Sequence, residues 1–117
     1  MGNFKKFRVW QKAKDLAVKI YKLTEQGQFA KDYGLKDQIR RSSVSIPSNI
    51  AEGEDLSTDK QSVRHFYIAR GSNAELRTQL SIAAEIGYLS PEKYHDIENE
   101  CDEISAMITM LIKHRMK

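Results

Sequence analysis

The chain has 117 residues, of which 30% are charged and 40% hydrophobic, with a formal net charge of +3, two prolines and one cysteine. This composition indicates one folded, mostly helical domain over residues 1–117, and it excludes a disordered chain, an internal disulfide and a cysteine-rich zinc site. No segment approaches the roughly eighteen uninterrupted apolar residues of a membrane span, and the first residues lack the hydrophobic core of a signal peptide. We therefore expect a cytoplasmic protein.

The positive charge is concentrated in the N-terminal part of the chain. Residues 1–50 hold eleven Lys and Arg against four Asp and Glu, whereas residues 51–117 hold eight against twelve. Such an asymmetry can steer a protein to nucleic acid, can be matched by an acidic surface on another subunit, or can be a solvated face without a partner.

The first predicted helix covers residues 9–26. Apolar residues recur three and four apart along it, which is typical of a helix with one buried side. They are Trp10, Ala13, Leu16, Ala17, Ile20 and Leu23. The other faces are rich in lysine, and Gly27 is expected to end the helix.

The second predicted helix, residues 35–53, has a proline in its interior. Ile39, Ser43, Ile46 and Ile50 share one side of this helix. Pro47 removes the hydrogen bond to the carbonyl of Ser43, at roughly 3 kcal/mol in an ordinary helix. We expect a kink at Pro47 and a compensating polar network packed against other helices.

The third predicted helix runs over residues 59–86. Thr58 and Gln61 have the spacing of a capping box at its start. Its apolar side is interrupted between Ile68 and Leu76, where Gly71 costs roughly 1 kcal/mol relative to alanine and so suggests a close approach of another helix.

The fourth predicted helix begins at Ser90-Pro91-Glu92, an N-cap serine followed by proline at the first position and an acidic residue. Residues spaced alternately three and four apart then form the seam of a bundle; they are Tyr94, Ile97, Cys101, Ile104, Ile108, Leu111 and Arg115. Short connections between four helices predict an all-α fold, an antiparallel up-and-down four-helix bundle.

The sequence offers no catalytic or metal-binding pattern. A di-iron bundle needs two Glu-x-x-His pairs, and the only such pair is Glu92 with His95. Cys101 lies on the apolar seam and is expected to be a buried small hydrophobic residue, not a nucleophile. We expect a non-enzymatic protein without catalytic residues, a metal or a cofactor.

A polar set interrupts the apolar sides of the second and third helices. It comprises Ser48, Asn49 and Glu52 with Arg70, Asn73 and Glu75. In an antiparallel pair Asn49 faces residues early in the third helix, while Arg70 is expected nearer Arg40 or Arg41. We interpret the set as a structural network or a subunit interface, with its pairing left open.

Basic residues on the first two helices are candidate contacts to nucleic acid. They are Lys5, Lys6, Arg8, Lys12, Lys19, Lys22, Arg40 and Arg41. Such a surface can follow phosphates without reading bases. The leading hypothesis is an oligomeric scaffold that binds RNA or DNA through these residues. The alternative is a protein–protein interaction adaptor with no nucleic-acid binding.

Four segments together carry a resemblance to a known family. They include Phe7-Arg8-Val9-Trp10-Gln11-Lys12-Ala13, Tyr33-Gly34-Leu35 with Gln38-Ile39-Arg40-Arg41, the run from Ser45 to Gly53, and Phe66-Tyr67-Ile68-Ala69-Arg70-Gly71-Ser72 with Glu75-Leu76. Over about residues 4–89 the chain resembles the bacterial four-helix bundle proteins first found as open reading frames in intervening sequences of 23S ribosomal RNA genes.

The resemblance implies a small up-and-down bundle of unknown function that forms a homopentamer in related members, with no established enzyme activity. A related branch is the accessory protein of diversity-generating retroelements, a basic pentamer thought to bind RNA and the reverse transcriptase. Carried over, this implies phosphate contacts by Arg40, Arg41 and the lysines of the first helix. It also implies scaffold or interface roles for Asn49, Glu52, Arg70 and Glu75.

Overall fold

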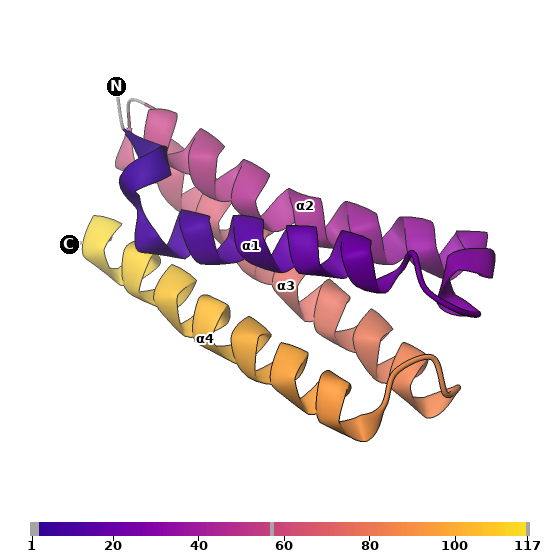
Figure 1. Ribbon diagram of the computed structural model, residues 1–117. Coiled ribbons are helices and arrows are strands. Elements are labelled where there is room, and N and C mark those ends of the chain that lie inside the picture. Colours follow the sequence, from indigo (N-terminus) through magenta and orange to yellow (C-terminus); the bar gives the residue numbers. More distant parts are fainter. Residues whose placement is uncertain (1–2, 57, 117) are drawn as a thin grey trace.

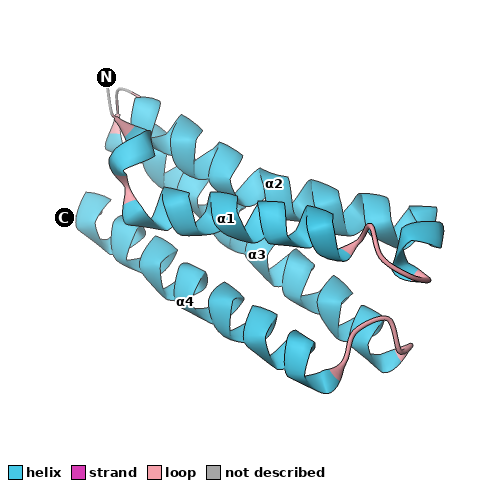
Figure 2. Ribbon diagram, in the orientation of Figure 1, coloured by secondary structure: helices cyan, strands magenta, loops and turns pink. Residues whose placement is uncertain are grey.

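Four long helices make up most of the computed structural model, which describes residues 3–56 and 58–116. They are α1 (Arg8–Leu23), α2 (Tyr33–Asp55), α3 (Asp59–Glu85) and α4 (Pro91–Arg115), with two short 3₁₀ helices, η1 (Phe4–Lys6) and η2 (Phe29–Lys31). Successive helices run in opposite directions (Figure 1), and the described residues contain no strand (Figure 2). The predicted all-α up-and-down bundle is confirmed.

Both chain ends lie at the same end of a bundle that is 44 Å long and about 20 Å wide (Figure 1). We call this the terminal end; it also holds the connection between α2 and α3. The opposite end, which we call the loop end, holds the α1–α2 and α3–α4 connections. No helix in the described part of the chain is long and apolar enough to cross a membrane.

Every helix contributes large apolar side chains to one core. The fully buried ones include Leu16 and Ile20 of α1, Ile39, Ile46 and Ile50 of α2, Phe66, Leu76 and Leu80 of α3, and Ile97, Ile104 and Ile108 of α4. Each such side chain stabilises the fold by roughly 1.5–3 kcal/mol through removal from water. The predicted apolar sides of the helices therefore form the interior.

Three of the predicted helix ends differ from the structure by two or three residues, and one of them is the end of α2, which lies at Asp55 and not at Gly53. α1 ends at Leu23 and not at Gln26. The Thr24 hydroxyl donates to the Ile20 carbonyl at 2.8 Å, and the next residues form tighter turns. These turns lead to Gly27, which has φ 56°. α2 begins at Tyr33, two residues early, because Asp32 Oδ1 accepts a hydrogen bond from the Leu35 amide at 3.1 Å. Local capping decides the end of α1 and the start of α2.

The starts of α3 and α4 confirm the predicted caps. Thr58 Oγ1 accepts from the Gln61 amide at 3.2 Å, and Ser90 Oγ accepts from the Lys93 amide at 3.1 Å with Pro91 at the first helical position. Serine and threonine at this position satisfy amides that have no partner inside the helix.

Helix α2 passes through Pro47 without interruption, and Pro47 itself is buried. A close contact with a neighbouring helix occurs at Gly53 and not at Gly71, where the sequence suggested one. A Cβ on Gly53 would lie 2.5 Å from Cε1 of Phe66, whereas a Cβ on Gly71 would meet nothing within 4 Å. Gly53 lets the Phe66 ring pack directly against the α2 backbone. The prediction chose the wrong glycine because a sequence does not show which face of a helix contacts a neighbouring helix.

Cys101 is fully buried on α4, as predicted. Burial, reinforced by the nearby Glu98 carboxylate, raises the pKa of the Cys101 thiol to about 12. The thiolate is therefore scarce at neutral pH, which fits a packing residue and not a nucleophile.

Candidate nucleic-acid interface

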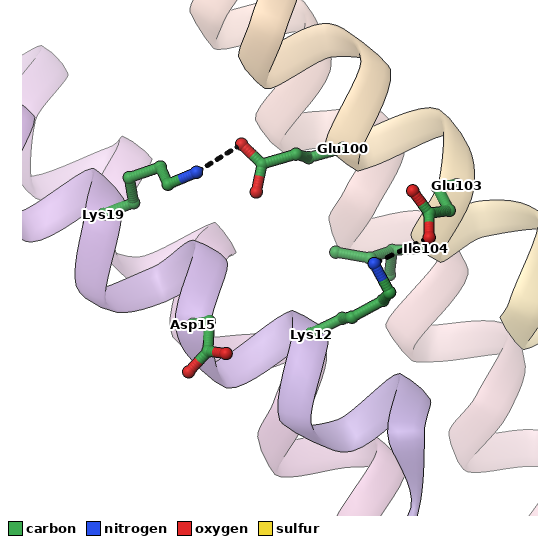
Figure 3. Close-up of a pocket in the computed structure, with 6 residues that line it drawn as sticks. All are labelled: Lys12, Asp15, Lys19, Glu100, Glu103 and Ile104. Atoms are coloured by element: carbon green, nitrogen blue, oxygen red, sulfur yellow. Dashed lines mark hydrogen bonds and ion pairs between the residues drawn. The ribbon is translucent and has the colours of Figure 1, made fainter.

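Two of the candidate lysines on α1 are paired with glutamates of α4. Lys12 Nζ lies 2.7 Å from Glu103 Oε1, and Lys19 Nζ lies 2.8 Å from Glu100 Oε2. Figure 3 shows the two pairs bridging the groove between the helices, with Ile104 beside the Lys12–Glu103 pair. The hydrogen bond from Lys12 lowers the pKa of Glu103. Phosphate binding by Lys12 or Lys19 would have to compete with these carboxylates.

Arg40 lies in a different setting from the one the sequence predicted. Its guanidinium donates to Thr24 Oγ1 at 2.8 Å and to the Tyr21 carbonyl at 3.2 Å, pairs with Glu25 and stacks 4.4 Å over the Tyr21 ring. The Arg40 side chain is 18% exposed. Its contacts join α2 to the end of α1, so we leave Arg40 out of the candidate surface.

The other candidate cations are exposed. These are Lys5, Lys6, Arg8, Lys22 and Arg41, and within residues 3–56 and 58–116 no carboxylate lies within 4.0 Å of their charged atoms. They do not form one surface. The segment that holds Lys5, Lys6 and Arg8, η1 and the start of α1, lies at the terminal end (Figure 1). Lys22 belongs to the last turn of α1, at the loop end, and Arg41 belongs to α2.

The fold adds basic residues to the terminal end that were not among the candidates from the sequence. Lys113 and His114 at the end of α4, and Lys60 and Arg64 at the start of α3, are all exposed. Their proximity to Lys5, Lys6 and Arg8 depends on the antiparallel arrangement. The only sequence signal was the basic tail of the fourth helix.

Arg115 belongs to this end but has a structural role. Its guanidinium lies 2.9 Å from Glu54 Oε1 and 3.3 Å from Asp59 Oδ1, and donates to Ser62 Oγ at 3.1 Å. The Glu54 side chain is only 4% exposed. Burial raises the pKa of Glu54, and the charge of Arg115 opposes that rise. This cluster ties the end of α4 to the α2–α3 connection.

The polar set predicted on α2 and α3 is only partly brought together. His65 Nδ1 lies 3.0 Å from Asn49 Oδ1 and 3.1 Å from Glu52 Oε2, so Asn49 does face the early part of α3. Ser48 and Glu75 are exposed, and within the described residues their side chains make no hydrogen bond.

Arg70 turns to another helix than the one expected. It donates to Thr109 Oγ1 of α4 at 3.2 Å and stacks 4.8 Å over the Tyr67 ring. Asn73 likewise faces α4, donating to the Cys101 carbonyl at 3.0 Å. The expected position failed because depth along α3 does not reveal which neighbour a side chain faces.

Two serines before Pro47 bind across the α2–α3 interface, as expected of the hydroxyl residues around the proline, although neither was named in the predicted polar set. Ser42 Oγ donates to Gln79 Oε1 at 2.7 Å, and Ser45 Oγ lies 2.8 Å from Ser72 Oγ. The signal for them was present, since small hydroxyl residues cluster before Pro47. In the described ranges, no three His, Cys, Asp or Glu side chains gather so that they could hold a metal ion.

Comparisons with known proteins agree with this architecture. Residues 5–110 match the sequence model of a family described as 23S rRNA-intervening sequence protein. A solved structure of a protein of unknown function from the S23 ribosomal protein family of Bacteroides thetaiotaomicron is similar, at 30% identity and a TM-score of 0.83. The similarity covers 90% of this chain and 98% of that one. No curated protein matched the chain.

Proposed function

The chain belongs to the 23S rRNA-intervening sequence protein family, and on that premise we propose that it is a non-enzymatic, oligomeric scaffold that binds RNA through phosphate contacts at the terminal end. The observation that carries this proposal is the gathering of exposed basic residues from four elements, η1, α1, α3 and α4, at that end. They are Lys5, Lys6, Arg8, Lys60, Arg64, Lys113 and His114. Acidic residues at the same end, Glu52, Glu54, Asp55 and Asp59, are fewer, and Glu54 and Asp59 are paired with Arg115.

Such a surface suits a backbone-directed interaction. Exposed lysines and arginines displace counterions from phosphates and give affinity that depends on salt more than on sequence. RNA and DNA share this phosphate chemistry, and the family's description refers to ribosomal RNA. RNA is therefore the first nucleic acid to test.

Exposed apolar residues support the oligomeric part of the proposal. Val44 of α2 and Ile68 and Ile82 of α3 are 40%, 43% and 46% exposed on neighbouring helices, and a Cβ on Gly71 of α3 would meet nothing within 4 Å. An apolar face of this kind is suited to burial against a second copy. Following the resemblance, we propose a homopentamer, in which weak phosphate contacts would be repeated and reinforced.

The test is the salt dependence of binding to a mixed-sequence single-stranded RNA. Replacing Lys5 and Lys6 by Gln should weaken binding at low salt and reduce the slope of log affinity against log salt by about 1.4, because each lysine neutralises one phosphate and each phosphate of a single strand contributes about 0.7. The matched control replaces Lys31 and Lys93, exposed lysines at the loop end, and should leave the slope unchanged. No binding at low salt would contradict the proposal.

The alternative function is an adaptor that binds a protein partner and no nucleic acid. In view of the resemblance, that partner would be a reverse transcriptase. This alternative predicts no RNA affinity at low salt and no difference between the two double variants. An apolar groove between α1 and α4 favours a protein partner as an additional ligand.

A further inference from the structure

An apolar groove opens at the terminal end between the start of α1 and the end of α4. It has a volume of about 400 Å³ and is lined mainly by Phe7, Met107, Met110 and Leu111, with Arg8 and His114 as its polar members. It is separate from the charged groove of Figure 3, which lies farther along the same two helices.

Several apolar side chains that line the groove are exposed to solvent. Met110 is 66% exposed, and Phe7, Met107 and Leu111 are only half-buried. Contiguous exposed apolar side chains of this kind mark interaction sites. Methionines adapt to different apolar side chains because their unbranched chains are flexible and their sulfur is polarisable.

Basic residues border the groove. Arg8 and His114 line it, and the exposed Lys6 and Lys113 are close in sequence to Phe7 and His114. The Glu103 carboxylate also lies toward Arg8 but is engaged by Lys12 at 2.7 Å. An occupant that complements this site has an apolar ridge flanked by carboxylates.

We propose that the groove binds an acidic amphipathic helix of a partner protein. Apolar side chains spaced i, i+3, i+4 and i+7 on that helix would fill the groove, while flanking Asp or Glu would pair with Arg8 and Lys113. A nucleobase fits the lining less well, because its polar edges need hydrogen-bond partners and the walls offer mostly carbon and sulfur. This partner goes beyond the proposed RNA contacts.

The test uses the full chain and a fluorescein-labelled peptide about 18 residues long, with leucines at these spacings and glutamates beside them. Fluorescence anisotropy without RNA keeps the result independent of the proposed function. Met110→Ser should weaken binding by about tenfold, the effect of removing one methionine side chain from the apolar wall. Met116→Ser, at a 63% exposed methionine outside the groove, is the matched control and should leave affinity within about twofold.

Each of the following results would overturn the proposal. The first is that the peptide with glutamates does not bind. The second is that Met110→Ser and Met116→Ser weaken peptide binding equally. The third is that a peptide with lysines in place of the glutamates binds as tightly as the peptide with glutamates. The fourth is that Met110→Ser weakens RNA binding and leaves peptide binding unchanged, which assigns the groove to nucleic acid. The fifth is that Met110→Ser dissociates an oligomer, which assigns the groove to a second copy of the chain.

Discussion

Arg40 shows how a residue with the chemistry of a phosphate contact can serve the fold instead. Three groups from the end of α1, namely the Tyr21 carbonyl, the Thr24 hydroxyl and the Glu25 carboxylate, surround its guanidinium. Arginine suits this position because its planar group donates several hydrogen bonds in fixed directions. The hydrogen bond from Arg40 lowers the pKa of Glu25.

Arg40→Met should therefore lower the free energy of unfolding by about 1–2 kcal/mol, since the Thr24 hydroxyl and the Tyr21 carbonyl lose a charged partner. Urea unfolding measures this change. Arg41→Met is the matched control, because Arg41 is exposed and should change stability by less than about 0.5 kcal/mol. Equal stability of the two variants would show that the Arg40 contacts are dispensable.

Glu54 gives the terminal end a pH dependence. Its pKa is raised in the folded chain, mainly by burial. A carboxyl group that binds its proton more tightly in the folded state favours folding at low pH, and this contribution is lost as pH rises through the folded pKa. Compared with Glu54→Gln, the wild-type chain should thus gain relative stability as pH falls from about 7 to about 4.

Urea unfolding of both proteins at the two pH values measures this difference, and the many groups they share cancel. The opposite result is that the wild type gains stability relative to Glu54→Gln as pH rises. It would mean that the effect of Arg115 on the pKa of Glu54 is larger than the effect of burial, and that the folded pKa lies below its ordinary value.

At the scale of elements, the α2–α3 pair is the most extensively packed of the four pairs of neighbouring long helices, and the α1–α4 pair is the least. Serine hydroxyls, Asn49 and the Gly53–Phe66 contact join α2 to α3. Two ion pairs bridge α1 and α4. The proline-bearing helix is thus held on its α3 side by packing and hydrogen bonds, which offset the hydrogen bond that Pro47 removes.

Gly53→Ala tests this packing. Its Cβ would lie 2.5 Å from Cε1 and 2.9 Å from Cδ1 of Phe66, so the ring or the helix must shift. We expect a net loss of about 1–2 kcal/mol in thermal or urea unfolding, although alanine is otherwise the better helix former. Gly34→Ala, whose Cβ would be 3.9 Å from Asp32 Oδ1, should be neutral or slightly stabilising. A stabilised Gly53→Ala variant would contradict the packing at this site.

At the scale of the whole molecule, the exposed face of Val44, Ile68 and Ile82 should decide assembly. Ile82→Lys would place a charge in the proposed contact between copies and should shift the chain toward monomer in sedimentation at micromolar concentration. Tyr33→Lys, at a 69% exposed residue near the loop end, is the control and should leave the sedimentation coefficient unchanged. A wild-type chain that sediments as a monomer would contradict the oligomer itself.

The sequence by itself determined the four helices, their order, the caps at Thr58 and Ser90, and the burial of residues such as Ile46, Ile104 and Cys101. These properties are local or periodic, so spacing along the chain reports them. The family resemblance was also carried by sequence alone, because its motifs are runs of neighbouring residues.

Only the tertiary structure decided which side chains meet. It paired Lys12 and Lys19 with α4, enclosed Arg40 within α1 and α2, turned Arg70 toward Thr109, and brought Lys113 and His114 to the end that holds Lys5 and Lys6. These relations join residues many positions apart, and they depend on the rotation and depth of each helix in the bundle. A linear pattern shows which side of a helix is apolar, but the charged sides acquire partners only when the helices pack.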